Sequence, residues 1–263
     1  MKWFVLCLIA SLGISTATAA EATVQLQKNE TTVQVNIGGQ AFTVLNFGPD
    51  YMKPFFAPVH TSSGEIISRS LDEVEDHPHH KGIWLSLDEV NGLNFWGEKA
   101  KIQNTAVEIV VAEGNPAELK LTNNWLGTDN NPILVEQTTV KIYNNRLMTY
   151  DTTLKAAVDK VEFADTKEGM FGIRLKNGMR EKEEGLLSTQ TSAKTTENCW
   201  GNRLTGSIIM APWTAKLSGG PVRSLRTTSA LPATTSGITD CSQSVPLAKA
   251  PTPTVKTLLH RSV

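Results

Sequence analysis

The sequence predicts an all-β protein, an antiparallel β-sandwich, because of how its apolar residues are spaced. Apolar and polar residues alternate, with many β-branched side chains, through most of residues 22–203, as in Thr23–Gln27, Thr32–Ile37 and Val107–Val111. Such alternation is typical of strands that bury one face. No segment before Arg203 keeps a 3.6-residue apolar period for three helical turns, so no long amphipathic helix is expected.

Turn signals between these runs predict that neighbouring strands are antiparallel. Gly38-Gly39 and Asn144-Asn145 each follow one alternating run and precede another, at the spacing of a tight hairpin. Long alternating runs over residues 132–143 and 146–157 indicate a large sheet. A sandwich of two such sheets is the simplest way to bury their apolar faces.

Residues 1–20 predict an export signal. Lys2 supplies the charged start, Trp3–Leu12 the apolar run, and Ala17-Thr18-Ala19 a small-residue cleavage site. We therefore expect a periplasmic or extracellular mature chain. The apolar run is too short to span a bilayer, and no later stretch approaches about 20 apolar residues, so no membrane span is expected in the mature chain.

The composition changes abruptly at Arg203. Residues 21–203 carry 18 Lys or Arg and 25 Asp or Glu, a balance of −7, whereas residues 204–263 carry 6 and 1, a balance of +5. The last 60 residues also hold 18 Ser or Thr and 6 Pro, but no Phe, Tyr, Asn or Glu. Composition alone therefore predicts a β domain over 21–203 and a disordered tail over 204–263. The net charge of −1 gives no sign of a nucleic-acid partner.

Three of the five histidines lie together as His77, His79 and His80, directly after Asp76. Imidazoles titrate near neutral pH and suit proton transfer or the binding of a transition metal. If residues 76–80 are extended, His77 and His79 share one face, but Pro78 favours an edge or a loop. We take the three histidines as catalytic candidates, with a structural hydrogen-bonded cluster as the alternative. No second ligand pair occurs at a recognisable spacing, so no metal or other cofactor is expected.

Amides and tryptophans follow the histidines. Asn91 and Asn94 offer donors and acceptors, and Trp84 and Trp96 offer flat apolar faces, which together suit a sugar ring. The alternative is that both tryptophans are core residues under a turn.

A later segment, residues 165–174, places acids before an apolar strand. Asp165 is a candidate substrate contact, Glu168 a general acid or base, and Arg174 a clamp for an anion or carboxylate. The alternative is a surface turn followed by a strand that carries a structural ion pair.

Six motifs occur along the chain in one order: Lys53–Val59, Ser68–Ser70, Asp76–Trp84, Asn91–Trp96, Asp165–Gly169 and Trp200–Arg203. In this order they resemble a family of exported bacterial proteins labelled PmoA, over roughly residues 22–203. The resemblance implies a fold similar to the sugar-mutarotase supersandwich and a part in carbohydrate degradation. It also implies that His77, His79, His80, Glu168 and Arg174 form the site. The label itself implies methane oxidation, which belongs to a membrane-spanning copper protein, so we expect no such activity here.

The resemblance stops after Arg203, where members of that family continue with an Asn-Trp segment, an aromatic-Gly turn and later an Asp-Tyr-Gly-Leu-Phe segment. Codons chosen for Leu204–Lys216 and for Gly237–Ala248 give both missing segments when they are read from the third base of each codon. We therefore hypothesise that residues 204–263 are an out-of-frame translation. The chain would then lack the C-terminal part of its sandwich and be poorly soluble and inactive, because apolar strand edges would stay uncovered.

For an intact protein of this kind, the sequence predicts a secreted carbohydrate-active enzyme. A histidine and Glu168 would exchange protons with a sugar, as in an epimerase- or lyase-like reaction. One alternative is a non-catalytic module that binds carbohydrate through the tryptophans and amides. Another is a protein with a histidine-ligated metal.

The reading-frame hypothesis predicts a single gained or lost base in the gene across the codons for Asn198 to Ser207. Sequencing of that locus from independent DNA molecules is the measurement. An intact frame, together with tail peptides detected by mass spectrometry of the protein, would show that the tail is genuine.

Overall fold

The structure, a computed structural model, describes residues 21–166 and 168–180 in full, and the backbone of strands at 186–189, 207–210, 225–230 and 254–261. The predicted signal at 1–20, Lys167, the Trp200–Arg203 motif and the rest of the tail lie outside the described residues. Within them the chain forms strands and one 3₁₀ turn at Asn177–Met179, and it contains no α-helix. Every strand pairing is antiparallel, which confirms the predicted fold class.

One layer of the sandwich is a seven-stranded sheet, in the order β13-β5-β4-β3-β2-β1-β9. The turn at Gly38-Gly39 joins β2 to β3 as predicted, and both glycines have positive φ, where a side chain would be strained. Its strands are β1 (Val24–Lys28), β2 (Thr32–Ile37), β3 (Gln40–Asn46), β4 (Phe55–Val59), β5 (Ile83–Leu87), β9 (Glu113–Gly114) and β13 (Gly169–Ile173).

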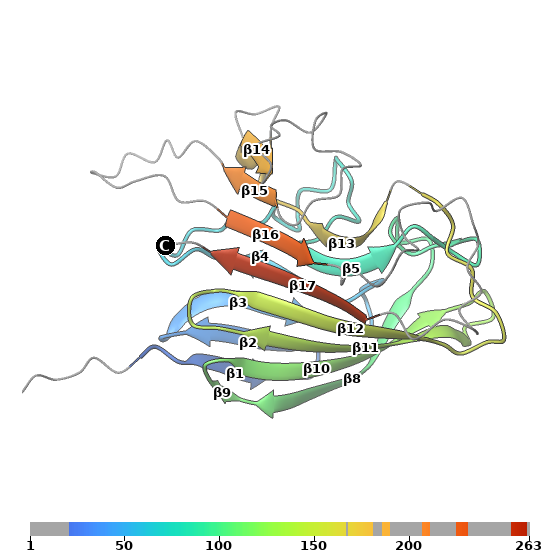
Figure 1. The fold of residues 1–263 in the computed structure, drawn as a ribbon, viewed down its shortest axis with the longest axis horizontal. Helices are drawn as coiled ribbons and strands as arrows, with labels where there is room; N and C mark the ends of the chain where they lie inside the picture. The colour runs from blue at the N-terminus through green and yellow to red at the C-terminus, as the bar shows by residue number, and fades with distance from the viewer. Residues whose placement is uncertain are drawn as a thin grey trace, which may run out of the picture.

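The other layer is an eight-stranded sheet, in the order β14-β15-β16-β17-β12-β11-β10-β8, and Figure 1 shows the two sheets lying one behind the other. The two long strands predicted from the sequence are β11 and β12, joined by a hairpin at Asn144-Asn145. A separate hairpin, β6 (Glu89–Val90) with β7 (Leu93–Asn94), follows β5. The strands of this sheet are β8 (Ile102–Val111), β10 (Ala117–Leu126), β11 (Pro132–Ile142), β12 (Met148–Ala156), β14 (Leu186–Thr189), β15 (Ser207–Met210), β16 (Leu225–Ala230) and β17 (Thr254–Arg261).

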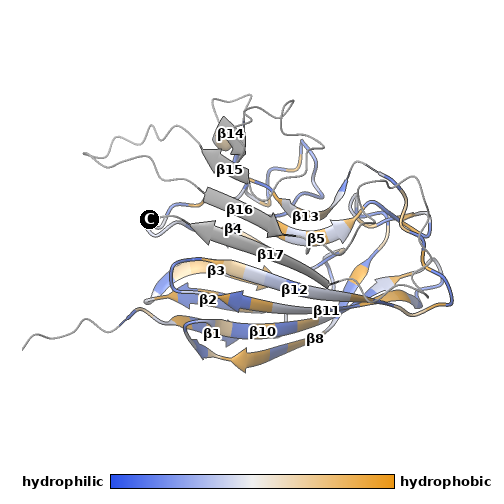
Figure 2. Ribbon diagram, viewed as in Figure 1, coloured by the Kyte–Doolittle hydropathy of each residue, from blue (hydrophilic) through white to orange (hydrophobic). Residues whose placement is uncertain are grey.

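The main core lies between the sheets and follows from the alternation in the sequence. Along β10, Leu119 and Leu121 are buried while the residues between them are not, and Val140 on β11 packs into the same cluster. Alternating hydrophobic and hydrophilic segments are visible along β2 and β10 in Figure 2. Each strand thus contributes one face to the core and one to its surroundings.

Strands β15, β16 and β17 come from the tail, and β17 pairs with the edge of β12 from Met148↔Leu259 to Thr153↔Thr254. Pairing of this kind uses main-chain groups, which are the same whatever side chains the tail carries. The pairing therefore does not distinguish the two reading frames, and the frame hypothesis stays a prediction.

A buried carboxylate interrupts the apolar inner face of the second sheet. Glu136 is 3% exposed and accepts hydrogen bonds from Asn123 Nδ2 (3.0 Å), Thr138 Oγ1 (2.8 Å) and Trp125 Nε1 (2.9 Å). All three donors are neutral groups. Burial therefore dominates and raises the pKa of Glu136, although these hydrogen bonds act to lower it.

Glu136→Gln is predicted to change how stability depends on pH. Because the folded-state pKa is raised, the stability that Glu136 contributes is present below its unfolded pKa of about 4.3 and is lost as pH rises through the folded value. Denaturant unfolding from about pH 4.5 to about pH 8 should show the wild type losing free energy of unfolding relative to the variant. The matched control is Glu108→Gln at an exposed position of β8. The prediction would be contradicted if the difference in free energy of unfolding between the wild type and Glu136→Gln were as independent of pH as the difference between the wild type and Glu108→Gln.

Candidate functional site

The histidines lie on the outer face of the seven-stranded sheet. Phe56 and Ile83 point into the core between the sheets, so their neighbours Phe55 and Trp84 point to the opposite face. There they form a smaller cluster with Ala57 and Trp96. The loops at residues 60–82 and 88–101 supply the residues that cover this cluster.

Residues 77–80 form a tight turn, closed by a hydrogen bond from the His80 N–H to the His77 carbonyl (2.9 Å). Pro78 occupies the second position of this turn, which its fixed φ favours. The loop that Pro78 predicted is therefore confirmed, and the extended conformation does not occur. The turn gathers all three imidazoles, with ring centroids 4.9 Å apart for His77 and His80, 4.5 Å for His79 and His80, and 5.7 Å for His77 and His79.

Two buried cations hold the main chain of this turn. Arg69 is 5% exposed and donates to the carbonyls of Asp76, His77 (2.8 Å) and His80 (3.0 Å). Lys53 is 1% exposed, and its Nζ donates to the His79 carbonyl (2.8 Å) and to Glu98 Oε1 (2.7 Å). Burial lowers the pKa of Lys53 to about 8, although Glu98 acts to raise it.

Sequence reasoning did not assign chemistry to Lys53, Arg69 or Glu98. Lys53 and Arg69 lie in two of the motifs that carry the family resemblance, Lys53–Val59 and Ser68–Ser70, so a signal was present. Their contact with the histidine turn was not predictable, because Lys53 lies 26 residues before His79.

Asp76 links the turn to β13. Its carboxylate accepts hydrogen bonds from Arg174 Nη2 (2.5 Å), from Arg180 Nη1 (3.3 Å) and from His77 Nδ1. Arg174 first, and then His77, holds the pKa of Asp76 well below its usual range. An ionised carboxylate only accepts, so Nδ1 of His77 carries a proton, and Nε2 is the nitrogen that presents a lone pair in the neutral form of the ring. The side chain of His77 is 54% exposed, so that lone pair can meet a ligand.

The other two histidines are less basic than free imidazole. Burial, followed by the neighbouring charges of His79 and His77, lowers the pKa of His80 to about 3. Burial and the Lys53 ammonium also lower the pKa of His79. His80 accepts a hydrogen bond at Nε2 from Trp96 Nε1 (3.1 Å), so its proton lies on Nδ1. We conclude that His80 is a neutral, structural member of the cluster.

The two predicted stacking platforms are buried. Trp84 is 2% and Trp96 8% exposed, and the His80 ring stacks on Trp84 at a centroid distance of 5.2 Å. They are core residues under a turn, the second of the two interpretations, and neither offers a flat face to a sugar.

The two predicted amides stabilise loops. Asn91 accepts from the Glu162 N–H (2.7 Å) and donates to the Lys160 carbonyl (3.3 Å). Asn94 donates to the Asp88 carboxylate and accepts from the Gly97 N–H (2.5 Å). These bonds fix the β6–β7 hairpin and the turn that follows it.

The register of β13 against β5 separates Arg174 from Glu168. Arg174 N–H donates to the Gly82 carbonyl (2.7 Å), next to the histidine turn, whereas the Glu168 carbonyl accepts from the Asp88 N–H (3.3 Å). Six residues of extended chain span roughly 20 Å, so Glu168 lies at the far end of the ladder. Asp165 is exposed and follows Ala164, which bonds Glu89 of the β6–β7 hairpin. The structure therefore brings Arg174 to the histidines but neither acid.

The described part of the chain contains no group of three or more His, Cys, Asp or Glu side chains that could hold a metal ion. It also contains no helix with the length and apolar character needed to cross a membrane.

A comparison with models of protein families shows the family to which this chain belongs. A model described as a family of unknown function (DUF6807) matches residues 32–221, from β2 to beyond β15. A comparison with curated proteins finds no match. The family match bears on neither the PmoA label nor the reading frame, which stay predictions.

His80 is predicted to remain neutral over the physiological pH range. Its lowered pKa means that the ring should keep the Nδ1–H tautomer from about pH 8 down to about pH 5, whereas a free imidazole titrates near 6.5. Nitrogen-15 NMR of the imidazole resonances, assigned with His80→Gln, is the measurement. A His80 midpoint near 6.5 would show that Trp96 and burial do not hold the ring neutral.

Proposed function

Because this chain belongs to a family of unknown function, we propose its activity from the site and from the resemblance seen in the sequence: a secreted, carbohydrate-active enzyme in which His77 removes a proton from a sugar. The reaction class is lyase- or epimerase-like acid–base chemistry. Carbohydrate as the substrate class follows from the family resemblance, and the proton transfer follows from the geometry of the turn.

The observation that supports this proposal is the pair formed by Asp76 and His77. An ionised carboxylate on Nδ1 fixes the tautomer and orientation of the ring and stabilises the imidazolium that forms when Nε2 takes a proton. Such a positioned base contributes about 10²–10⁴ to a rate. His77 is also the most exposed of the three imidazoles, and the other two are held less basic by burial.

The surrounding cations are positioning residues. Arg174 and Arg180 keep Asp76 ionised. Arg174 therefore forms a structural ion pair, which was the alternative to its predicted role as an anion clamp. Arg69 and Lys53 fix the main chain of the turn, which sets the direction of each ring. None of these four needs to touch the substrate to affect the reaction.

Glu168 has no place at this centre, because roughly 20 Å of β13 separates it from Arg174. A two-base epimerase needs a second group on the opposite face of the sugar. A lyase-like elimination can use one base that takes the carbon-bound proton and passes it to the leaving oxygen. The geometry therefore favours the lyase-like reaction over a histidine and Glu168 acting together.

The two rival functions have less support from the site. A non-catalytic module built on Trp84, Trp96, Asn91 and Asn94 would need exposed rings and free amides, but the rings are buried and the amides bond the loops. A metal protein would bind stoichiometric metal through His79, which metal analysis of wild type and His79→Ala tests directly.

His77→Ala is predicted to lower turnover by about 10²–10⁴, and Asp76→Asn to lower it in the same direction by disturbing the tautomer of His77. The assay follows deuterium uptake from D₂O and double-bond formation in uronic-acid oligosaccharides and reducing sugars by NMR. It uses the chain as written and the chain with its frame restored, because the former is expected to be inactive if the tail is out of frame.

The matched control is Glu75→Gln, an exposed acid next to Asp76, which should keep full turnover. Unchanged turnover in both His77→Ala and His79→Ala would refute the assignment. Loss of activity in Glu168→Ala as complete as in His77→Ala would show that the acid at the far end of β13 takes part after all.

A further inference from the structure

A cleft of about 250 Å³ lies between the loop that joins β3 to β4 and the beginning of β8. We infer that this cleft is a binding subsite for one sugar unit, separate from the histidine turn. None of the residues predicted from the sequence as site members lines it. The inference rests on the proposed function only for the class of ligand.

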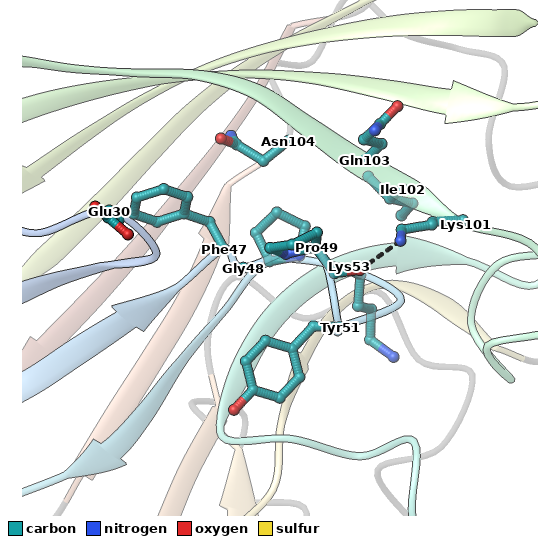
Figure 3. Close-up of a pocket in the computed structure, with 11 residues that line it drawn as sticks. Glu30, Phe47, Gly48, Pro49, Tyr51, Lys53, Lys101, Ile102, Gln103 and Asn104 are labelled. Atoms are coloured by element: carbon teal, nitrogen blue, oxygen red, sulfur yellow. Dashed lines mark hydrogen bonds between the residues drawn. The ribbon is translucent and has the colours of Figure 1, made fainter.

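Most of its walls come from two segments far apart in the sequence, and Glu30, between β1 and β2, belongs to a third (Figure 3). Phe47 and Tyr51 belong to the loop after β3, whereas Gln103 and Asn104 lie on β8. A main-chain hydrogen bond from Ile102 N–H to the Met52 carbonyl (2.8 Å) ties the two segments together. The cleft is therefore a fixed part of the fold.

The polar groups of the lining point to a ligand with hydroxyl groups. Gln103 is exposed and its amide can both donate and accept, and the exposed Glu30 carboxylate can accept. Asn104 donates from Nδ2 to Asn123 Oδ1 (2.8 Å), so the Oδ1 of Asn104 is left to accept a hydrogen bond from a ligand. Lys101 donates from Nζ to the Pro49 carbonyl (2.6 Å) and so fixes the loop, as the dashed line in Figure 3 shows.

The apolar residues and the charges of the lining narrow the chemical class of the ligand further. Phe47 and Tyr51 are half-buried rings that can pack against the C–H face of a sugar ring. Glu30 and Lys101 carry opposite charges, and the third charged lining residue, Lys53, is paired with Glu98 (2.7 Å), so the cleft has no unpaired cation that would select a phosphate or another strong anion. Pockets for drug-sized ligands occupy about 300–1,000 Å³, so a cleft of this volume suits one small ring.

Lys53 connects this cleft to the proposed catalytic turn. Lys53 is one of the lining residues, its side chain is fully buried, and in Figure 3 its amino group points away from Lys101. That amino group bonds the His79 carbonyl (2.8 Å) on the other side. A sugar unit held in the cleft would thus lie one lysine side chain away from the histidine turn. The arrangement fits a substrate of more than one sugar unit, with one unit bound here and its neighbour at His77.

The test is direct binding of sugars to the full chain, both as written and with its frame restored. Both forms contain the cleft, because every residue of the cleft precedes residue 105. Saturation-transfer NMR would be run with glucose, galactose, mannose, xylose and galacturonate, and with adenine and phenylalanine as non-sugars of similar size. We expect at least one sugar to bind. Gln103→Ala should weaken that binding about threefold to tenfold, because it removes one or two hydrogen bonds.

Matched variants make the result specific. Gln27→Ala, at an exposed position of β1, should bind like wild type, and Tyr51→Leu should weaken binding while circular dichroism confirms the fold. His77→Ala should still bind the sugar although its turnover is lost, which separates this inference from the proposed function. Binding of no sugar, binding of the non-sugars alone, or sugar binding equal in Gln103→Ala and Gln27→Ala would overturn the inference.

Discussion

Two buried cations need hydrogen-bond acceptors, and this need determines the conformation of the histidine turn. Arg69 and Lys53 are almost fully removed from water, and a buried cation without hydrogen bonds is costly, although the buried Nε of Arg69 has no acceptor among the described residues. Most of the acceptors described for them are main-chain carbonyls of residues 76–80, and Glu98 supplies the neutralising charge for Lys53. The turn can therefore not move without leaving a buried charge unbonded. The positions of all three imidazoles follow from this constraint.

The same arrangement gives the histidines different surroundings. Asp76 is kept ionised by Arg174 and so fixes the ring of His77, whereas His80 lies on Trp84 and accepts from Trp96 in a place that disfavours its charge. The pKa values of Asp76 and His80 are therefore both lowered, the first by hydrogen bonds from Arg174 and the second by burial. Shifted pKa values are common where a fold supports acid–base chemistry, although structural ion pairs also shift them. Exposure then decides which ring can meet a substrate, because only His77 combines a fixed tautomer with open access.

The sugar subsite that we propose lies in the cleft beside β8 and not at the groups expected from the sequence. Trp84, Trp96 and the amides of the β6–β7 hairpin, which were expected to contact carbohydrate, instead stabilise the loops. The cleft has the same kinds of group, rings and amides, on residues that no local sequence pattern connects. In the two proposals, proton transfer and sugar binding would belong to neighbouring but different surfaces, with Lys53 between them.

The sequence by itself determined strands before Arg203, the hairpins at Gly38-Gly39 and Asn144-Asn145, and the loop at the histidines. Alternation and β-branched residues are local signals, and so are the paired glycines at residues 38–39 and the fixed φ of Pro78. The tertiary structure alone decided which predicted site residues meet. Register places Gly82 beside Arg174 and Asp88 beside Glu168, and burial depends on which loops cover the outer face of the sheet. These outcomes depend on pairing between distant segments, which no local pattern encodes, so the separation of Glu168 from the histidines and the contacts of Lys53 could be found only in the folded chain.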